Sequence, residues 1–162
     1  MITIRQVMNP KVVAVRPDMT VADTIEFLTE NHVGGAPVVN GLGELVGLTS
    51  EIELIDVVFD QAVRNAPVSK FMTEAVQVVC PDEPLTRAAQ LFALFSFRRL
   101  PVIERGKLIG IITRRNLMNY TLRSNQVLVD PLVELIPSLA LSRSSGSLPH
   151  RLKNVAYADL PR

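Results

Sequence analysis

Four arginines in the second half of the chain are the residues whose types and spacing point most directly to chemistry. They form two pairs, Arg98-Arg99 and Arg114-Arg115, and the second pair follows Thr113 at the predicted start of a helix. The free N–H groups of a helix N-terminus favour an anion, and a guanidinium fork matches two phosphate oxygens. The pattern predicts phosphate binding by Arg99 or Arg114, and the alternative is that these arginines form surface salt bridges.

The equivalent helix in the first half starts with a different polar pair, Ser50 and Glu53. Ser followed three residues later by Glu is a capping box, in which each side chain satisfies a backbone N–H group at the helix start. In the second half Thr113 is a sound N-cap by itself, and Asn116 stands at the position of Glu53. The sequence therefore predicts a capped helix at both places.

These helix starts are equivalent because the chain repeats itself. The residues that recur 64 positions later are Met8, Val12, Val15, Pro17, Asp18, Pro37 and Val38, and those that recur 63 positions later are Gly43, Leu45, Gly47 and Leu54. A unit of about 60 residues exceeds the roughly 20–50 residues of most solenoid repeats. Two such copies predict two half-modules packed about a pseudo-twofold axis, with functional surfaces where they meet.

Each copy predicts the same order of elements. In the first copy we expect a strand at 12–15, a helix at 20–31, strands at 36–39 and 45–49 joined by a hairpin loop, and a helix over about 50–62. In the second copy the corresponding elements are 76–79, 84–95, 100–103, 107–112 and a helix from 113, with short helical turns at about 4–8 and 68–72 ahead of each copy. Val21, Ile25 and Leu28 lie on one helical face, as do Leu85, Ala89 and Phe92.

Three motifs that occur in this order in both copies carry a resemblance to a known family. They are Met8-Asn9-Pro10 and Met72-Thr73, Gly35-Ala36-Pro37-Val38-Val39-Asn40 and Arg99-Leu100-Pro101-Val102-Ile103, and Gly47-Leu48-Thr49-Ser50 and Gly110-Ile111-Ile112-Thr113. Over about residues 1–123 the chain resembles a pair of CBS domains, the module named after cystathionine β-synthase. The resemblance implies an α/β fold of the α+β type, with two tandem β-α-β-β-α repeats at residues 1–64 and 65–123.

The resemblance also implies a function. CBS pairs are usually regulatory sensors, which bind AMP, ADP, ATP or S-adenosylmethionine in clefts between the repeats, signal to a protein partner and often form a disc-like homodimer. This implies a regulatory module that is not an enzyme, has no catalytic residues and acts on a protein target that the sequence does not identify. The alternative is a ligand-independent homodimerisation scaffold. The observation in support of this second hypothesis is that Glu53 and Asn116 replace the family's ribose-binding Asp.

Site residues follow from the same resemblance. In the family, the Thr or Ser that opens the last helix and the Asp three residues on hold the ribose and a nearby phosphate, which here implies Ser50, Glu53, Thr113 and Asn116. Adenine would contact the first strand and the residues before Pro-Val, which implies Val76, Val78 and Leu100 in one copy and Val12, Ala14 and Ala36 in the other. Gly35, the position equivalent to Arg99, is a further candidate. The segment 97–101 resembles the phosphate-contacting segment of the AMP-activated kinase γ subunit, which adds Arg98, Arg99, Leu100, Pro101 and, beside Thr113, Arg114.

Composition bounds the remaining possibilities. The 162 residues are 48% hydrophobic, without an apolar run of membrane-spanning length or a signal-peptide pattern, so we expect a cytoplasmic protein without membrane contact. One cysteine and two separated histidines provide no disulfide and no metal site, and His32 is read as a cation at a helix end or as a ligand contact. The basic residues lack the aromatic interleaving typical of nucleic-acid binding.

Charge is distributed unevenly between the copies. Residues 1–64 carry four basic and nine acidic side chains, whereas residues 65–125 carry nine basic and four acidic ones. The second copy therefore suits an anionic ligand better, and the alternative is attraction between the two halves. Residues 124–162 are expected to form a C-terminal helical extension and a mobile tail, whose apolar residues would dock on a partner in one interpretation.

Overall fold

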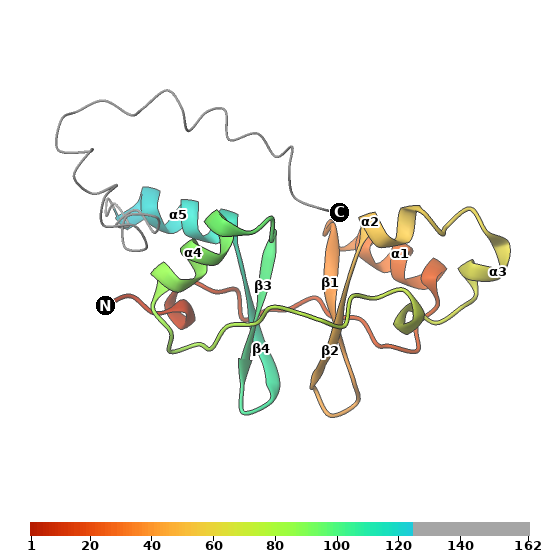
Figure 1. Ribbon diagram of the computed structural model, residues 1–162, viewed down its shortest axis with the longest axis horizontal. Helices are drawn as coiled ribbons and strands as arrows, with labels where there is room; N and C mark the ends of the chain where they lie inside the picture. The colour runs from red at the N-terminus through yellow and green to blue at the C-terminus, as the bar shows by residue number, and fades with distance from the viewer. Residues whose placement is uncertain (125–162) are drawn as a thin grey trace, which may run out of the picture.

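Two antiparallel hairpins stand side by side at the centre of the computed structural model, with helices on their outer flanks (Figure 1). The structure describes residues 1–124, so the predicted extension and tail lie outside it except for Ser124. The elements are the 3-10 helix η1 (Ile4–Gln6), α1 (Val21–Glu30), β1 (Gly35–Val39), β2 (Leu45–Ser50), α2 (Glu51–Ile55), α3 (Gln61–Arg64), the 3-10 helix η2 (Val68–Lys70), α4 (Leu85–Leu94), β3 (Arg99–Glu104), β4 (Lys107–Thr113) and α5 (Arg114–Ser124).

The hairpins confirm the predicted strand pairs. Arg105 and Gly106 have φ values of 50° and 78°, which is the positive-φ pair of a two-residue turn between β3 and β4. The first loop is one residue longer, and the Asn40 side chain organises it by accepting from the backbone N–H groups of Leu42 and Glu44 at 2.9 and 3.0 Å. Both hairpins shift register at equivalent places, after Val38 and after Val102.

The long helix of each repeat packs the face that the sequence predicts. Thr20 caps α1 by accepting from the backbone N–H of Asp23 at 3.0 Å, and Val21 and Leu28 are buried beneath it. In α4, Leu85, Ala89 and Phe92 are all buried. Each of these helices therefore covers one end of the hydrophobic core beside its hairpin.

The short leading segments cross over, so that each core contains a segment from the other repeat. Ile4 of η1 is fully buried in a cluster with Val79, Leu85 and Leu100, and its N–H donates to the carbonyl of Glu83 at 2.9 Å. Val68 of η2 is equally buried, in a cluster made of first-repeat residues. Figure 1 shows the N-terminus beside α4 and the chain that leads to η2 beside α1. The packing units consequently consist of one repeat plus the leading segment of the other.

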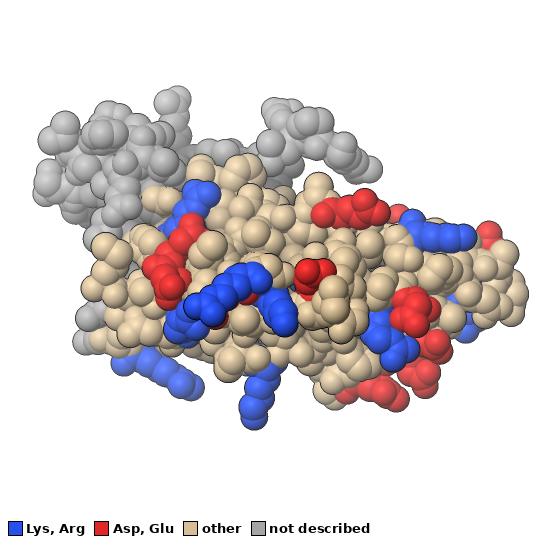
Figure 2. All heavy atoms as spheres, turned by 90° about the horizontal axis from the view of Figure 1, so that it is seen from below, with Lys and Arg blue, Asp and Glu red and all other residues tan. Residues whose placement is uncertain are grey.

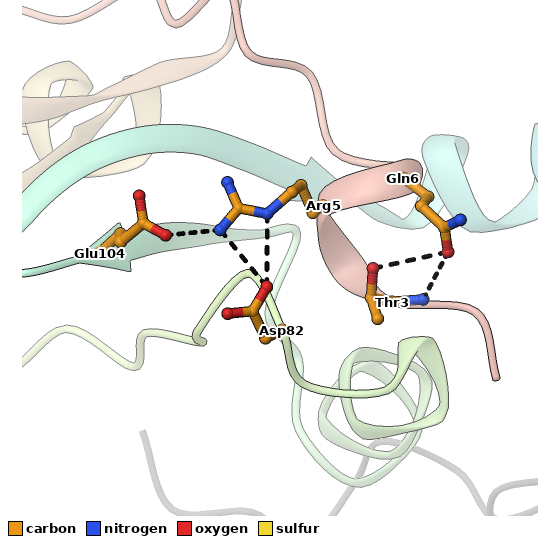
Figure 3. Close-up of polar contacts among 5 residues, drawn as sticks. All are labelled: Thr3, Arg5, Gln6, Asp82 and Glu104. Atoms are coloured by element: carbon orange, nitrogen blue, oxygen red, sulfur yellow. Dashed lines mark hydrogen bonds and ion pairs between the residues drawn. The ribbon is translucent and has the colours of Figure 1, made fainter.

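Arg5 fastens η1 to the second repeat from the surface (Figure 3). Its guanidinium donates to Asp82 at 3.3 Å and to Glu104 at 2.5 Å, and Thr3 and Gln6 bond to each other beside it. The hydrogen bond with Glu104 is the main cause that raises the pKa of Arg5. Because both carboxylates belong to the second repeat, this cluster supports the crossover.

Three predicted elements are wrong. The strands expected at 12–15 and 76–79 reduce to single parallel bridges, from Val15 to Val38 and from Val79 to Val102. The helix expected over 50–62 stops at Ile55 and resumes as α3 after Asp60, which caps it through the N–H of Ala62 at 2.9 Å. Two consecutive valines at 57 and 58 are poor helix formers, and Asp60 is a better cap than an interior residue.

The two repeats differ in surface charge as the sequence indicates. Most of the acidic side chains seen in Figure 2 gather over the half that carries α1–α3, and basic side chains gather over the centre and the other half. Among residues 1–124, none of the helices combines the length and apolar character that crossing a membrane requires.

Candidate ligand-binding clefts

Two clefts of similar size lie where the repeats meet. The Ser50 cleft has a volume of about 250 Å³ and is lined by Leu48, Thr49, Ser50, Ile52, Glu53, Thr73, Ala75, Val76, Gln77, Ser96, Phe97, Arg98 and Arg99. The Thr113 cleft has a volume of about 240 Å³ and is lined by Asn9, Lys11, Val12, Val13, Val33, Gly34, Gly35, Arg98, Arg99, Ile111 and Thr113. Most of these residues are equivalent under the repeat, so the clefts are related by the pseudo-twofold axis.

Both repeats contribute to each cleft, which corrects the grouping by copy that the sequence predicts. Ser50, at the end of β2, faces the same cleft as Val76, which belongs to the second repeat. Thr113, at the end of β4, faces the same cleft as Val12 of the first repeat. The crossover explains this exchange, because residues 9–13 and 73–77 pass over the opposite hairpin before they join their own. Ligand contacts that the sequence assigns to one copy are therefore divided between two clefts.

Arg99 lies between the clefts and borders both of them. It extends from the start of β3 across to Gly34 and Gly35 of the first repeat. A Cβ atom added at Gly35 would overlap Nη1 of Arg99. Arg98 also lines both clefts, so the basic character is shared between them instead of being confined to the second, as the sequence suggests.

The surroundings of Arg99 disfavour the charged form of its side chain. Burial lowers its pKa, the neighbouring Arg98 lowers it further, and Glu51 and Glu53 act in the opposite direction. The guanidinium nevertheless stays protonated at neutral pH. Apart from the backbone pairing of β3 with β4, no hydrogen bond or ion pair within 4.0 Å joins the Arg99 guanidinium to another residue in the range 1–124. A half-buried guanidinium with unused donors can bind an anion that enters either cleft.

The Ser50 cleft contains a hydroxyl and carboxylate network. The Ser50 hydroxyl donates to one oxygen of Glu53, and the Thr73 hydroxyl donates to the other at 3.3 Å. The expected capping box is absent here, because the Ser50 side chain makes no bond to the helix backbone. Thr49 is 1% exposed, and its hydroxyl has no partner among the described residues. The wall thus offers polar oxygens to a hydroxylated ligand.

The reciprocal cap occurs in the second repeat instead. The backbone N–H of Thr113 donates to Oδ1 of Asn116 at 2.9 Å, and the N–H of Asn116 donates to the Thr113 hydroxyl at 3.3 Å. Thr113 is therefore the N-cap that the sequence predicts, while Asn116 points back to the cap and does not line either cleft. A shorter Asn side chain suits this geometry, whereas Glu53 reaches further, to Thr73.

Several predicted ligand contacts lie elsewhere. Arg114 borders neither cleft; its Nη2 donates to the carbonyl of Phe95 at 3.3 Å, and its Nε is buried without a described partner. The remaining ones are Leu100, Pro101 and Ala36, which are buried, Val78, which is exposed beside the hairpins, and Ala14, which is half-buried outside the lining. The buried residues among these pack in the hydrophobic cores, because they alternate along the strands with the residues that face the clefts.

The structure also brings in residues that the sequence analysis missed, chiefly Lys11, Thr49, Thr73, Gln77 and Phe97. Two of these residues could be recognised from the sequence, because each differs in type from the equivalent residue of the other repeat. Thr49 occupies the position of the buried Ile112, so a polar side chain replaces a core residue, and Lys11 replaces Ala75. His32 adopts a φ of 53° just after α1 and lines neither cleft. No cluster of metal-binding side chains occurs within the described range.

The profile of the CBS domain matches residues 4–60 and 68–123, once per repeat. The chain belongs to the CBS-domain family. Its CBS pair superposes with a TM-score of 0.72 on CBSX2 in complex with AMP, a protein of Arabidopsis thaliana that is 33% identical, covering 78% of this chain and 100% of that one.

Some longer proteins contain a region that is similar to this chain. The uncharacterized protein MJ1225 of Methanocaldococcus jannaschii is 37% identical over 111 residues, which are 68% of this chain and 39% of that protein. The A-adding tRNA nucleotidyltransferase of Aquifex aeolicus is 28% identical over 115 residues, 71% of this chain and 14% of the enzyme. This chain therefore spans well under half the length of these relatives.

Gly35 is the position where a small change should disturb the clefts most. A Cβ there would lie 2.6 Å from the carbonyl oxygen of Thr49 and 2.9 Å from Cα of Ser50. Because backbone atoms cannot move aside cheaply, we expect Gly35→Ala to lower the free energy of unfolding by about 1–3 kcal/mol. Gly41→Ala is the matched control, since its Cβ would meet nothing within 4 Å. Urea unfolding measures both, and equal stabilities would contradict the contact.

Proposed function

We propose that this CBS pair is a regulatory module that binds an adenine nucleotide in the clefts between its repeats and signals the occupancy to a partner protein. The observation that carries the proposal is Arg99, a half-buried guanidinium that borders both clefts and has no hydrogen-bonding partner in residues 1–124. The complex of the similar CBSX2 with AMP supports the same ligand class. AMP, ADP, ATP and S-adenosylmethionine are the ligands to be compared.

Each cleft offers groups suited to a different part of such a ligand. In the Thr113 cleft, none of the residues that form its lining is acidic, and Lys11, Arg98 and Arg99 provide positive charge. In the Ser50 cleft, Glu53 and Ser50 provide oxygens for ribose hydroxyls, and Val76 and Phe97 provide apolar surface for adenine. We therefore assign the phosphate-bearing ligand preferentially to the Thr113 cleft, where no carboxylate of the lining opposes it.

Signalling requires that the ligand bind two arrangements of the pair with different affinities. Arg99 belongs to the second repeat and extends over Gly34 and Gly35 of the first. An anion that binds its guanidinium would therefore lie between the two repeats and would favour one angle between the hairpins. We propose no catalytic role for the chain. Its similarity to the nucleotidyltransferase is confined to 14% of that enzyme, so no activity is carried over from it.

Calorimetric titration of the full chain tests the proposal. We expect AMP, ADP or ATP to bind more tightly than adenosine, with about one phosphate-bearing ligand per chain, because Arg98 and Arg99 border both clefts and a second phosphate would compete for them. A thermal-shift series with the same ligands and S-adenosylmethionine is the independent measurement. The absence of both heat and stabilisation at millimolar concentrations of every ligand would refute the proposal.

A specific observation favours the alternative, a ligand-independent homodimerisation scaffold. Both side chains at the family's ribose position already have partners, since Glu53 accepts from Ser50 and Thr73, and Asn116 caps α5. A ligand would have to replace these hydrogen bonds, which reduces the net free energy of binding. Retained dimerisation together with clefts that respond to none of the ligands would support the scaffold.

A further inference from the structure

An apolar groove lies between α1 and α2, on the outer flank of the first repeat. It has a volume of about 250 Å³ and is lined by Ile25, Leu28, Thr29, Glu51, Leu54, Ile55 and Val58. It shares no lining residue with either cleft. Beside it, Ile55 is 59% exposed and Phe59 is 89% exposed. Exposed apolar surface next to a groove marks an interaction site, and we call the groove together with Phe59 the α2 surface.

The α2 surface lies in the most acidic part of the chain. Residues 17–63 contain no Lys and no Arg. The exposed carboxylates of α1, of α2 and of the loop after α2 belong to Asp23, Glu26, Glu30, Glu51, Asp56 and Asp60. Within residues 1–124, none of these carboxylates takes part in an ion pair. A segment that is both apolar and basic therefore complements this surface.

The C-terminal part of the same chain contains a segment of that chemistry. Residues 135–158 include no Asp and no Glu, and their basic side chains are Arg143, Arg151 and Lys153. Apolar residues that recur there at the i, i+4, i+7 spacing of one helical face are Leu148, Leu152 and Val155. We call residues 143–157 the basic segment.

The basic segment can reach the α2 surface without leaving its own chain. The described structure ends at Ser124, the last residue of α5, and Figure 1 shows α5 and α2 on the same side of the molecule. The connecting residues 125–142 can span up to about 60 Å. This exceeds the radius of gyration of about 14 Å that is typical of a domain with as many residues as the described part. A tether of this kind gives an effective concentration of about millimolar, so a weak contact is sufficient.

We propose that the α2 surface binds the basic segment of the same chain, with an apolar side chain of that segment in the groove and Arg151 and Lys153 beside the carboxylates. Two copies of the α2 surface facing each other would instead bring acidic side chains together, which is unfavourable. The proposal concerns this contact alone. It does not depend on a ligand in the clefts, because the groove shares no lining residue with them.

Cysteine cross-linking of the full chain tests the contact. In a Cys80→Ser background, which removes the one native cysteine, Thr29→Cys in the groove lining is combined with Ser147→Cys in the basic segment. A short bismaleimide at low protein concentration should join the two positions within a monomer, which peptide mass spectrometry identifies. We expect a yield at least about fivefold above that of the control pair Leu42→Cys and Ser147→Cys, in which Leu42 is 69% exposed at a hairpin loop.

Charge reversal tests the electrostatic part of the contact. At low salt, Asp56→Lys and Arg151→Glu should each lower the cross-linking yield about fivefold, and the double variant should restore most of it. A Lys at position 56 also suits the C-terminal end of α2, so the helix is not expected to unfold. Glu44→Lys is the matched control, because it makes the same charge change at the loop between β1 and β2.

Hydrogen exchange of the full chain gives an independent result. Leu152→Asp should raise the exchange of amides in α1 and α2 and leave those of β3 and β4 unchanged. Unchanged exchange together with a cross-linking yield equal to that of the control pair overturns the proposal, whether the chain is a monomer or a dimer. The groove would then belong to a second copy or to a separate basic protein. Cross-links found only between chains would overturn the intramolecular contact.

Discussion

Replacing Arg99 by alanine is expected to weaken AMP binding by about 10- to 100-fold while changing the affinity for adenosine by less than about threefold. Hydrogen bonds to a charged group contribute about 1.5–3 kcal/mol, and each 1.4 kcal/mol corresponds to about a factor of ten in affinity. Arg99 has donors that are unused among residues 1–124, so a phosphate would gain these bonds without breaking an existing ion pair. Calorimetry with both ligands separates the phosphate contribution from the nucleoside contribution.

Two further variants make this experiment specific. Arg114→Ala removes an arginine that borders neither cleft and donates to the carbonyl of Phe95, so AMP affinity should change little even if stability falls. Lys107→Ala removes an exposed charge at the start of β4, away from both linings, and controls for net charge. Equal losses of AMP and adenosine affinity in Arg99→Ala would show that Arg99 maintains the cleft's shape and does not contact phosphate.

The comparison of Arg99 with Arg114 shows where sequence reasoning succeeds and where it stops. Arg99 is the first residue of one motif of the repeat, and Arg114 directly follows another. Both side chains can bind a phosphate. Which of them reaches a cleft depends on the glycines opposite, because Arg99 extends over Gly34 and Gly35, whereas Arg114 turns back toward Phe95. The direction of a side chain at the start of a strand or helix depends on tertiary contacts, and the repeat pattern does not contain it.

The crossover of the leading segments is another feature that depends on tertiary contacts and that the repeat pattern does not contain. The offset of 64 identifies Ile4 and Val68 as equivalent. Local patterns correctly predict the short turns around them, the helix that starts at about Thr20 and the strands at 100–103 and 107–112. Equivalence alone does not state which core receives each segment, because either arrangement buries the same side chains. The grouping of cleft residues by copy failed for this reason.

Replacing Ile4 by alanine is expected to destabilise the second repeat, although Ile4 opens the first. The side chain is fully buried against Val79, Leu85 and Leu100. Truncating a buried Ile to Ala costs about 2–5 kcal/mol through lost burial and the cavity left behind. This is a large share of the roughly 5–15 kcal/mol that stabilises an ordinary domain. Denaturant unfolding measures the total loss, and Ile4→Val, expected to cost only about 0.5–1.5 kcal/mol, remains folded if alanine does not.

Hydrogen exchange read by mass spectrometry locates that loss. Amides of α4, β3 and β4 should lose protection in the Ile4 variants, because their core contains the missing side chain. The matched Val68→Ala variant should loosen α1, β1 and β2 instead, since Val68 lies in the first repeat's cluster. If each variant loosened the repeat to which it belongs in sequence, the crossover would be refuted. The shared construction of the two clefts would then lose its structural basis, because residues 9–13 and 73–77 reach the opposite hairpin only through these segments.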